Sequence, residues 1–319
     1  MTELVSLVVP FYNEAEAIPH FRAMLLPVLE AIPGTDWEII CVDDGSADTT
    51  LLQLVALAQA DPRFRVIEFS RNFGKEAALT AGIDAARGAA VIPIDADLQD
   101  PPELIAQMLA AWRAGAEVVL ARRTDRTSDG VLKRKTAAWF YRLHNRMSHT
   151  KIPENVGDFR LMDRVVVNAL KQLPERQRFM KGLFAWIGYP QAQVLYDRAP
   201  RAAGTTKWNY GRLWRFAVEG VTSFSTVPLR LATWVGTLTS LLAFAYGGWI
   251  VLKVFVWGIS VPGYASLIVA ILFLGGMQLL ALGIIGEYVG RTYLEVKQRP
   301  LYLIEASVGA AAPPSDAMP

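Results

Sequence analysis

Residues 89–102 of the chain read AAVIPIDADLQDPP, an apolar run that ends in acidic residues. The apolar part has the length and composition of a buried strand. Because side chains alternate along a strand, Asp95 and Asp97 are expected on the same side of the chain. Two carboxylates at a strand end suit a hard divalent cation that carries phosphate groups. The stretch also fits a plain strand-to-helix turn, in which Asp100 caps a helix that begins at Pro101.

Apolar runs alternate with helical patterns on both sides of this stretch. Strands are expected at residues 4–10, 37–42, 65–69, 89–94 and 117–121, and helices at about 15–31, from 48, 75–86 and 101–114. This alternation predicts an α/β fold with a mostly parallel sheet and helices on both faces. Ligands of such sheets bind at the carboxyl ends of the strands. Polar residues follow these ends at 12–14, 43–46, 95–99 and 122–123, which predicts one site along that edge.

Composition excludes several classes of protein. The net charge of +2 over 319 residues gives no general nucleic-acid footprint, so no nucleic-acid partner is expected. The single cysteine, Cys41, lies in an apolar strand and is expected to be a small core residue. The three histidines have no metal-ligand spacing, and the first residues enter a strand directly, without the pattern of a signal peptide.

A long apolar region follows the α/β pattern. Residues 231–286 contain one charged residue, Lys253, and divide at a Gly- and Pro-containing loop. Each half is long enough for a helix that spans a bilayer. We expect two transmembrane helices, at about 229–256 and 264–288, within a membrane segment 229–289. A buried hairpin of a soluble core is the alternative.

Charge predicts the orientation of these spans. Lys and Arg residues flank both spans, whereas the connecting loop 257–264 contains neither. The positive-inside rule therefore places the catalytic domain and both termini in the cytoplasm, with the protein in the plasma (inner) membrane. Residues 290–319 are expected to form a cytoplasmic tail, disordered from about 307.

Two basic and aromatic segments are expected to lie on the membrane surface. Residues 131–147 place Trp139, Leu143 and Met147 on one helical stripe flanked by cations. Residues 208–228 repeat this pattern directly before the first span. Such helices bind anionic membrane surfaces; nucleic-acid binding is the competing interpretation for the first.

Several motifs together resemble one enzyme family. They are VPFYNE at 9–14, DDGS at 43–46, SRNFGK at 70–75, DADLQDPP at 95–102, NVGDFRLM at 155–162, RQRFMKGLFAWIG at 176–188, TTKW at 205–208 and GEYVGR at 286–291. The chain resembles, over roughly residues 4–305, the polyprenyl-phosphate branch of glycosyltransferase family 2. That branch includes dolichol-phosphate mannose synthases and bactoprenol glucosyl transferases. The resemblance implies a GT-A (Rossmann-like) catalytic domain over residues 1–207.

The resemblance also implies roles for individual residues. Asp97 and Gln99 would bind a divalent metal, Mg²⁺ or Mn²⁺, and Asp97 would thereby also be catalytic. The nucleotide sugar would be held by Pro10, Tyr12, Glu14, Asp44, Asp95 and Lys75. The acceptor phosphate needs cations, for which Arg122, Arg201 and Lys207 are the candidates. Asp158, expected in a turn, would be the catalytic base or would orient the acceptor. Asp163 is expected to cap a helix at 164–173, and Arg160 to pair with Asp158 or with the donor phosphate.

These roles amount to one predicted reaction. A sugar, with glucose as the first candidate, passes from a UDP-sugar to polyprenyl (undecaprenyl) phosphate at the cytoplasmic membrane face, with inversion. The product is a lipid-linked sugar for the modification of cell-surface glycans. The resemblance further implies a homo-oligomer, a tetramer. The alternatives are another donor sugar (GlcNAc, galactose, mannose from GDP, or an aminoarabinose derivative), processive polysaccharide synthesis, and a catalytically silent binding subunit on the membrane.

Overall fold

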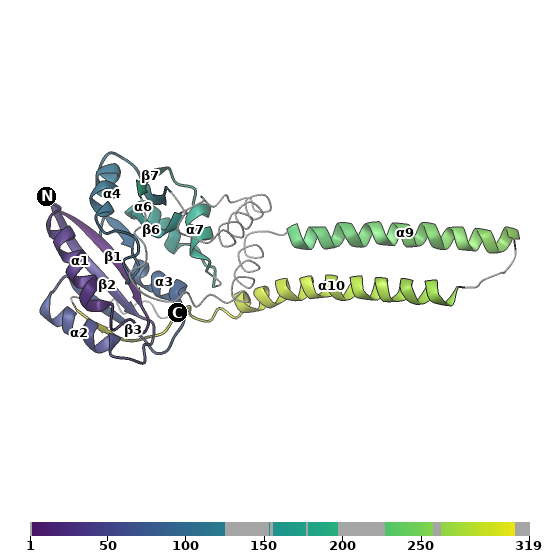
Figure 1. Cartoon of the computed structure of the whole chain (residues 1–319), viewed down its shortest axis with the longest axis horizontal. Helices are drawn as coiled ribbons and strands as arrows, with labels where there is room; N and C mark the ends of the chain where they lie inside the picture. The colour runs from purple at the N-terminus through teal and green to yellow at the C-terminus, as the bar shows by residue number, and fades with distance from the viewer. Residues whose placement is uncertain are drawn as a thin grey trace. The chain divides into compact units, whose positions relative to one another are not determined.

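The computed structural model describes residues 2–124, 153, 156–176, 178–196, 227–257 and 263–309. These residues belong to two compact units (Figure 1). The first unit is an α/β domain that contains the described residues up to Tyr196 together with those from Arg299 onward. The second unit contains the long apolar helices between them.

The α/β unit is built on one eight-stranded sheet of order β7-β5-β6-β4-β1-β2-β3-β8. Along the chain its elements are β1 (Glu3–Phe11), α1 (Ile18–Glu30), β2 (Thr35–Asp43), α2 (Thr50–Ala60), β3 (Phe64–Phe69), α3 (Lys75–Ala85), β4 (Ala90–Pro93), α4 (Leu104–Arg113), β5 (Val118–Arg123), β6 (Val156–Asp163), α6 (Arg164–Lys171), α7 (Met180–Trp186), β7 (Gln191–Tyr196) and β8 (Ile304–Val308). β1 pairs in parallel with β2 and β4, β2 with β3, and β5 with β7. β6 and β8 are antiparallel to their neighbours. The predicted α/β fold with a mostly parallel sheet is confirmed.

Helices cover both faces of the sheet, as the continuous apolar strands require. Val5, Leu7 and Val9 of β1 belong to the buried cluster that includes the apolar sides of α1, α2 and α4. Val8 points to the opposite face, where it meets α3 at Gly82. A Cβ at Gly82 would overlap Val8 Cγ1, so α3 can lie this close to the sheet only with glycine there.

Three strands differ from the sequence-based expectations. β6 includes Asp158, which therefore lies in a strand and not in a turn. β7 pairs with β5 although its side chains are largely exposed. β8 pairs with β3 and contains Ser307 and Val308, so the expectation of disorder from about 307 is wrong at these two residues.

The helix ends give one correction and one confirmation. α4 begins at Leu104, and Asp100 is not its cap. Asp100 is buried and accepts hydrogen bonds from Tyr196 Oη and, at 3.5 Å, from Arg123 Nη2. The predicted cap Asp163 is confirmed, because its side chain accepts from the Val165 N–H at the start of α6. Cys41 is buried in the core, as expected.

The second unit is a pair of helices, α9 (Val227–Trp257) and α10 (Tyr264–Val296), which lie side by side (Figure 1). Both are long and apolar enough to cross a membrane, over Leu229–Trp257 and Leu267–Val296, with mean hydropathies of 1.6 and 2.5. None of the residues in these windows is buried within the structure. An apolar helix that the protein does not cover suits lipid, so the pair is a candidate membrane hairpin. Most of the two predicted surface helices, at 131–147 and 208–228, lies outside the described residues.

Candidate active site

The carboxyl edge of the sheet gathers the predicted acids where β1 separates β2 from β4. In an open α/β sheet this is the point where ligands bind. The loop after β4 makes a tight turn there. Leu98 N donates to Asp95 O at 3.1 Å, and Leu98 has a φ of 42°. A left-handed conformation at a leucine is uncommon and is typical of functional loops.

The turn leaves Asp97 open to solvent. Its Oδ1 accepts the backbone N–H of Gln99 at 3.2 Å, and Gln99 itself is half-buried. Within the described part of the chain Asp97 makes no ion pair. An exposed carboxylate with a free oxygen and a neighbouring amide can share a cation with substrate phosphates.

Lys75 joins two predicted acids from different strands. Its Nζ lies 2.7 Å from Asp95 Oδ1 and 3.0 Å from Asp158 Oδ2. Burial works to lower the pKa of Lys75, but the charges of Asp158 and Asp95 outweigh it and hold the pKa above its usual value. Lys75 is therefore protonated, and it brings the acid of β6 next to the loop after β4.

Only one carboxylate oxygen of Asp158 is hydrogen-bonded among the described residues. Oδ2 is bound to Lys75, while Oδ1 is buried and has no hydrogen-bond partner among the described residues. Burial alone would raise the pKa of Asp158, but the charges of Lys75 and Lys181 hold it below its usual value. Buried oxygens are nearly always hydrogen-bonded, so an ionised carboxylate with a free oxygen points to a ligand.

Asp44, just after β2, holds two loops of this edge together. Its carboxylate accepts the N–H groups of Phe73 and Gly74, at 2.6 Å and 2.9 Å. The neighbouring Gly45, at φ 66°, permits the same loop to approach, because a Cβ would lie 2.5 Å from the Arg71 carbonyl carbon. Asp44 thus orders the turn after β3.

Asp43 is a residue whose role the sequence motif did not assign. Its Oδ2 accepts from Ser46 N at 3.1 Å, while its buried Oδ1 has no partner in the described structure.

The predicted donor-binding residues of the first loop lie at the end of β1. Pro10 pairs with Val42, and Tyr12 is 49% exposed beside this edge. Glu14 N donates to Thr50 Oγ1 at 2.9 Å. Burial, followed by the charges of Asp97 and Asp95, raises the pKa of the Glu14 carboxyl.

The predicted acceptor cations are only partly described. Arg122 lies at the end of β5 and donates to Gln193 Oε1 at 3.1 Å. Arg201 and Lys207 lie outside the described residues. Arg160 donates to the backbone oxygens of Gly157, at 2.7 Å, and Asp158, at 3.3 Å. Of the two expected partners of Arg160, the Asp158 carboxylate accepts no hydrogen bond from it among the described residues, and pairing with the donor phosphate stays a prediction.

Glu76 is a further acid that the sequence did not single out. It lies in the first turn of α3 and accepts the Met180 N–H at 3.2 Å, so it links the starts of α3 and α7. Burial, and then the charge of Asp158, raises its pKa to about 7. Only the three-dimensional contact with α7, 104 residues away, distinguishes Glu76 from an ordinary first-turn glutamate.

The residues after β4 could bind a metal ion only if the substrate supplied most of the other ligands. Among the described residues no three His, Cys, Asp or Glu side chains are grouped to hold an ion. Mg²⁺ in nucleotide sites commonly takes one or two protein oxygens, with phosphates and water completing its shell. The open Asp97 carboxylate next to Gln99 meets that requirement.

A sheet of this topology with acids at its carboxyl edge defines a GT-A glycosyltransferase domain. Residues 6–171 match the model of "Glycosyl transferase family 2", and residues 227–292 match that of the "GtrB C-terminal hairpin". The chain belongs to glycosyltransferase family 2.

Curated relatives match almost the whole chain. The chain is 57% identical over 304 residues to "Uncharacterized glycosyltransferase sll0501" of Synechocystis sp., with 95% of each chain covered. It is 53% identical over 301 residues to the "Prophage bactoprenol glucosyl transferase homolog" of Escherichia coli, covering 94% of this chain and 98% of that one. It is 54% identical over 303 residues to the "Bactoprenol glucosyl transferase" of Shigella phage SfII, covering 95% and 98%.

Proposed function

We propose that this enzyme transfers a sugar, with glucose as the first candidate, from a UDP-sugar to polyprenyl phosphate. The observation that carries the proposal is the position of Asp158. Lys75 holds this acid beside the loop of Asp95 and Asp97, and one buried oxygen of Asp158 has no partner among the residues that the structure describes. The names of the relatives from Escherichia coli and the Shigella phage supply the acceptor, bactoprenol, and the sugar.

The proposed reaction is a direct displacement. A phosphate oxygen of the lipid forms a bond to the anomeric carbon while the bond from that carbon to UDP breaks on the opposite face. A phosphate monoester is largely dianionic at neutral pH, since its second pKa is about 6. It needs little help from a base, so the main role of Asp158 is to orient the acceptor, with any residual proton passing to Oδ1.

The donor binds at the edge formed by β1, β2 and β4. In this proposal Pro10, Tyr12, Glu14, Asp44 and Asp95 contact the nucleoside, and Lys75 is a further residue that binds the donor. Asp97 and Gln99 would hold a divalent ion, which when bound neutralises the charge of the leaving diphosphate. Arg122, Arg201 and Lys207 are the proposed contacts of the acceptor phosphate.

The bilayer is the proposed site of the lipid substrate. The candidate hairpin α9 and α10 would span it, with the α/β domain and both termini in the cytoplasm, as the Lys and Arg residues that flank the spans predict. A cysteine placed at Ser260 in a Cys41→Ser background tests this. It should react with an impermeant thiol reagent on intact cells, and reaction only after the membrane is opened would contradict the orientation.

The function itself is tested by product analysis. The purified protein is incubated with polyprenyl phosphate, Mg²⁺ or Mn²⁺, and each of a panel of nucleotide sugars, and the lipids are read by mass spectrometry. A hexosyl polyprenyl phosphate from UDP-glucose is expected, and NMR of the anomeric centre should show a β-linked product from the α-linked donor. An α-linked product would exclude single displacement, and a different sugar would correct the donor.

A further inference from the structure

The α/β unit contains a buried cation that forms no ion pair among the described residues. Arg160 of β6 is 5% exposed. In the part of the chain that the structure describes, no carboxylate lies within ion-pair distance of its guanidinium. Its hydrogen bonds go to two backbone oxygens, which accept from Nη2 and Nε, and Nη1 has no acceptor within the part of the chain that the structure describes. Buried charges are normally paired, because an unpaired one is costly.

The surroundings of Arg160 stabilise it without cancelling its charge. The guanidinium carbon lies 4.0 Å from the centroid of the Phe184 ring of α7. An aromatic face attracts a cation but carries no net charge. Burial lowers the pKa of Arg160 to about 10, and only the charge of Asp158 opposes this effect. A bound anion would supply the missing partner for the charge of Arg160.

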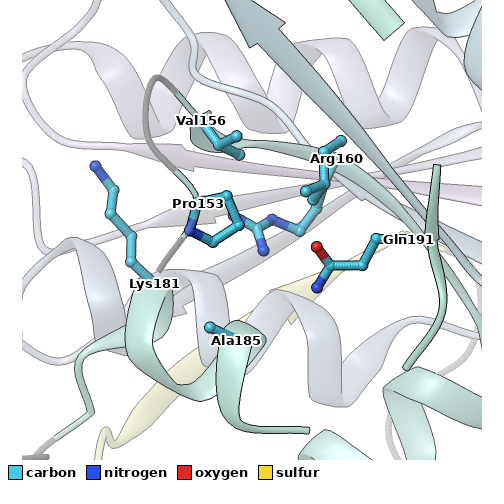
Figure 2. Close-up of a pocket in the computed structure, with 7 residues that line it drawn as sticks. Pro153, Val156, Arg160, Lys181, Ala185 and Gln191 are labelled. Carbon is cyan, nitrogen blue, oxygen red and sulfur yellow. The ribbon is translucent and has the colours of Figure 1, made fainter. Parts of the chain in front are cut away.

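A small pocket opens beside this guanidinium (Figure 2). Arg160, Lys181 of α7 and Gln191 of β7 line it together with Leu120 and Pro153, and none of its described lining residues is acidic. Figure 2 shows the Gln191 amide turned toward the Arg160 guanidinium, while the Lys181 ammonium points away on a long, rotatable stem. Neither Lys181 nor the Gln191 side chain has a hydrogen-bond partner among the described residues. The pocket thus offers unused donors and two positive charges.

The pocket is linked to the reacting acid through three residues of β6. Arg160 binds the backbone oxygens of Gly157 and Asp158, and Asp158 is the residue that Lys75 holds. Lys181 also lies close enough to Asp158 for its charge to lower the pKa of that acid. A group bound here would therefore lie next to the proposed transfer site.

We infer that this pocket, lined by Arg160, Lys181 and Gln191, binds a phosphate group. Guanidinium and ammonium donors are the side chains that recognise phosphate. The inference rests on the proposed function for its two sources of phosphate, the lipid acceptor and the diphosphate of the donor. The sequence offered the donor phosphate as one of two partners of Arg160, and it assigned neither source to Lys181 or Gln191.

The first test needs no turnover. Thermal unfolding of the full-length protein is followed with inorganic phosphate and, separately, pyrophosphate, since a ligand of the folded state raises the midpoint. Lys181→Met should weaken the apparent affinity for at least one of these anions about tenfold, the effect of losing one charge-assisted hydrogen bond. Arg160→Lys, which keeps the charge and loses the planar fork, should do the same. Arg22→Met, which removes an exposed cation of α1, is the matched control and should change nothing.

Kinetics then distinguish the two sources of phosphate. If the lipid phosphate binds, Lys181→Met raises the KM for polyprenyl phosphate about tenfold and leaves the KM for the UDP-sugar unchanged. If the diphosphate binds, the affinity for UDP falls by a similar factor while that for uridine does not. Equal affinities in the wild type, Lys181→Met and Arg160→Lys for phosphate, pyrophosphate, UDP and lipid would overturn the pocket. A wild-type protein without transfer activity would overturn the proposed function, and the anion-binding test would still decide the pocket.

Discussion

Two carboxylates of the same sheet, the buried Glu38 and the half-buried Asp158, have opposite surroundings. Glu38 lies in the amino-terminal half of β2 and uses both oxygens. Oε1 accepts from Arg65 at 2.6 Å and from Arg87 at 2.9 Å, and Oε2 accepts from Ser6 at 2.7 Å. Burial works to raise the pKa of Glu38, but these hydrogen bonds hold it below its usual value.

Asp158 also has cations nearby, yet its Oδ1 has no partner among the described residues. The same residues offer no acceptor to Arg160 Nη1, two positions further along β6. Asp43, at the carboxyl end of β2, leaves a buried oxygen free as well. Complete networks stabilise a fold, and incomplete ones are typical of places where a ligand supplies the missing partner. The comparison therefore separates a residue that holds the sheet together, Glu38, from residues that we propose contact the substrates.

The largest expected effect is on stability, at Glu38. Glu38→Gln leaves the buried Arg65 without its ion pair, and the free energy of unfolding should fall by about 3–5 kcal/mol. Chemical denaturation of the detergent-solubilised protein measures it. The matched control is Glu3→Gln, which breaks the exposed pair with Arg113 and should change stability by less than about 0.5 kcal/mol. Equal losses in both variants would contradict the distinction.

The next effect is on rate, at Asp97. Asp97→Asn should lower kcat/KM about 100-fold, because a cation that offsets the leaving diphosphate contributes several kcal/mol. Its stability should stay within about 0.5 kcal/mol, since the side chain is exposed and makes no ion pair among the described residues. Glu16→Gln, an exposed acid of the loop before α1, serves as the control. Full turnover of the wild type in excess chelator would remove the metal from the proposal.

A smaller effect concerns pH and Glu76. Its pKa of about 7 in the folded protein lies above the ordinary glutamate value of 4.5, so the folded state binds an extra proton between these pH values. Stability should therefore fall as the pH rises from about 4.5 to 7 and level off above that. Glu76→Gln keeps an acceptor for the Met180 N–H and should remove this fall, which is on the order of 3 kcal/mol. Identical pH profiles for both proteins would show that Glu76 does not titrate as described.

The smallest effect is expected at Tyr302, which follows α10 in sequence and precedes β8. Its hydroxyl donates to Asp84 at 3.1 Å, and its ring stacks on Phe69 with centroids 5.1 Å apart. Tyr302→Phe keeps the stack and should lower the free energy of unfolding by about 1 kcal/mol. Tyr302→Ala loses both contacts and should cost more. A Phe variant as unstable as the Ala variant would assign the whole effect to the hydroxyl.

The sequence predicted the parts of this molecule that are encoded locally. The apolar runs before Asp43 and Asp95 marked parallel strands, and their order placed the acids at one edge. The sequence did not predict β6 and β8, because Asp158 and Arg160 interrupt the apolar pattern of β6 and Glu305 interrupts that of β8. The pairing of both strands is set by strands that are distant in the sequence.

Predictions for single side chains failed where the partner of the residue lies far away in the sequence. Asp100 has the sequence context of a helix cap, yet its partner Tyr196 lies 96 residues further along the chain. The motif assigned the donor role to Asp44, whose carboxylate holds the Phe73–Gly74 turn, and it did not assign one to Asp43. Unsatisfied atoms such as Asp158 Oδ1 can be recognised only in three dimensions.

The most direct test of the account is a single-turnover measurement on two variants, Asp158→Asn and Glu38→Gln. Enzyme in excess over UDP-sugar is mixed with polyprenyl phosphate, and the sugar-lipid formed is divided by the amount of folded protein. Asp158→Asn should remain folded and lose about 100-fold or more in rate, as for other acids that contact the reacting groups. Glu38→Gln should be less stable and yet transfer sugar at the wild-type rate per folded molecule. Wild-type transfer by Asp158→Asn, or a comparable loss of rate in folded Glu38→Gln, would contradict the account.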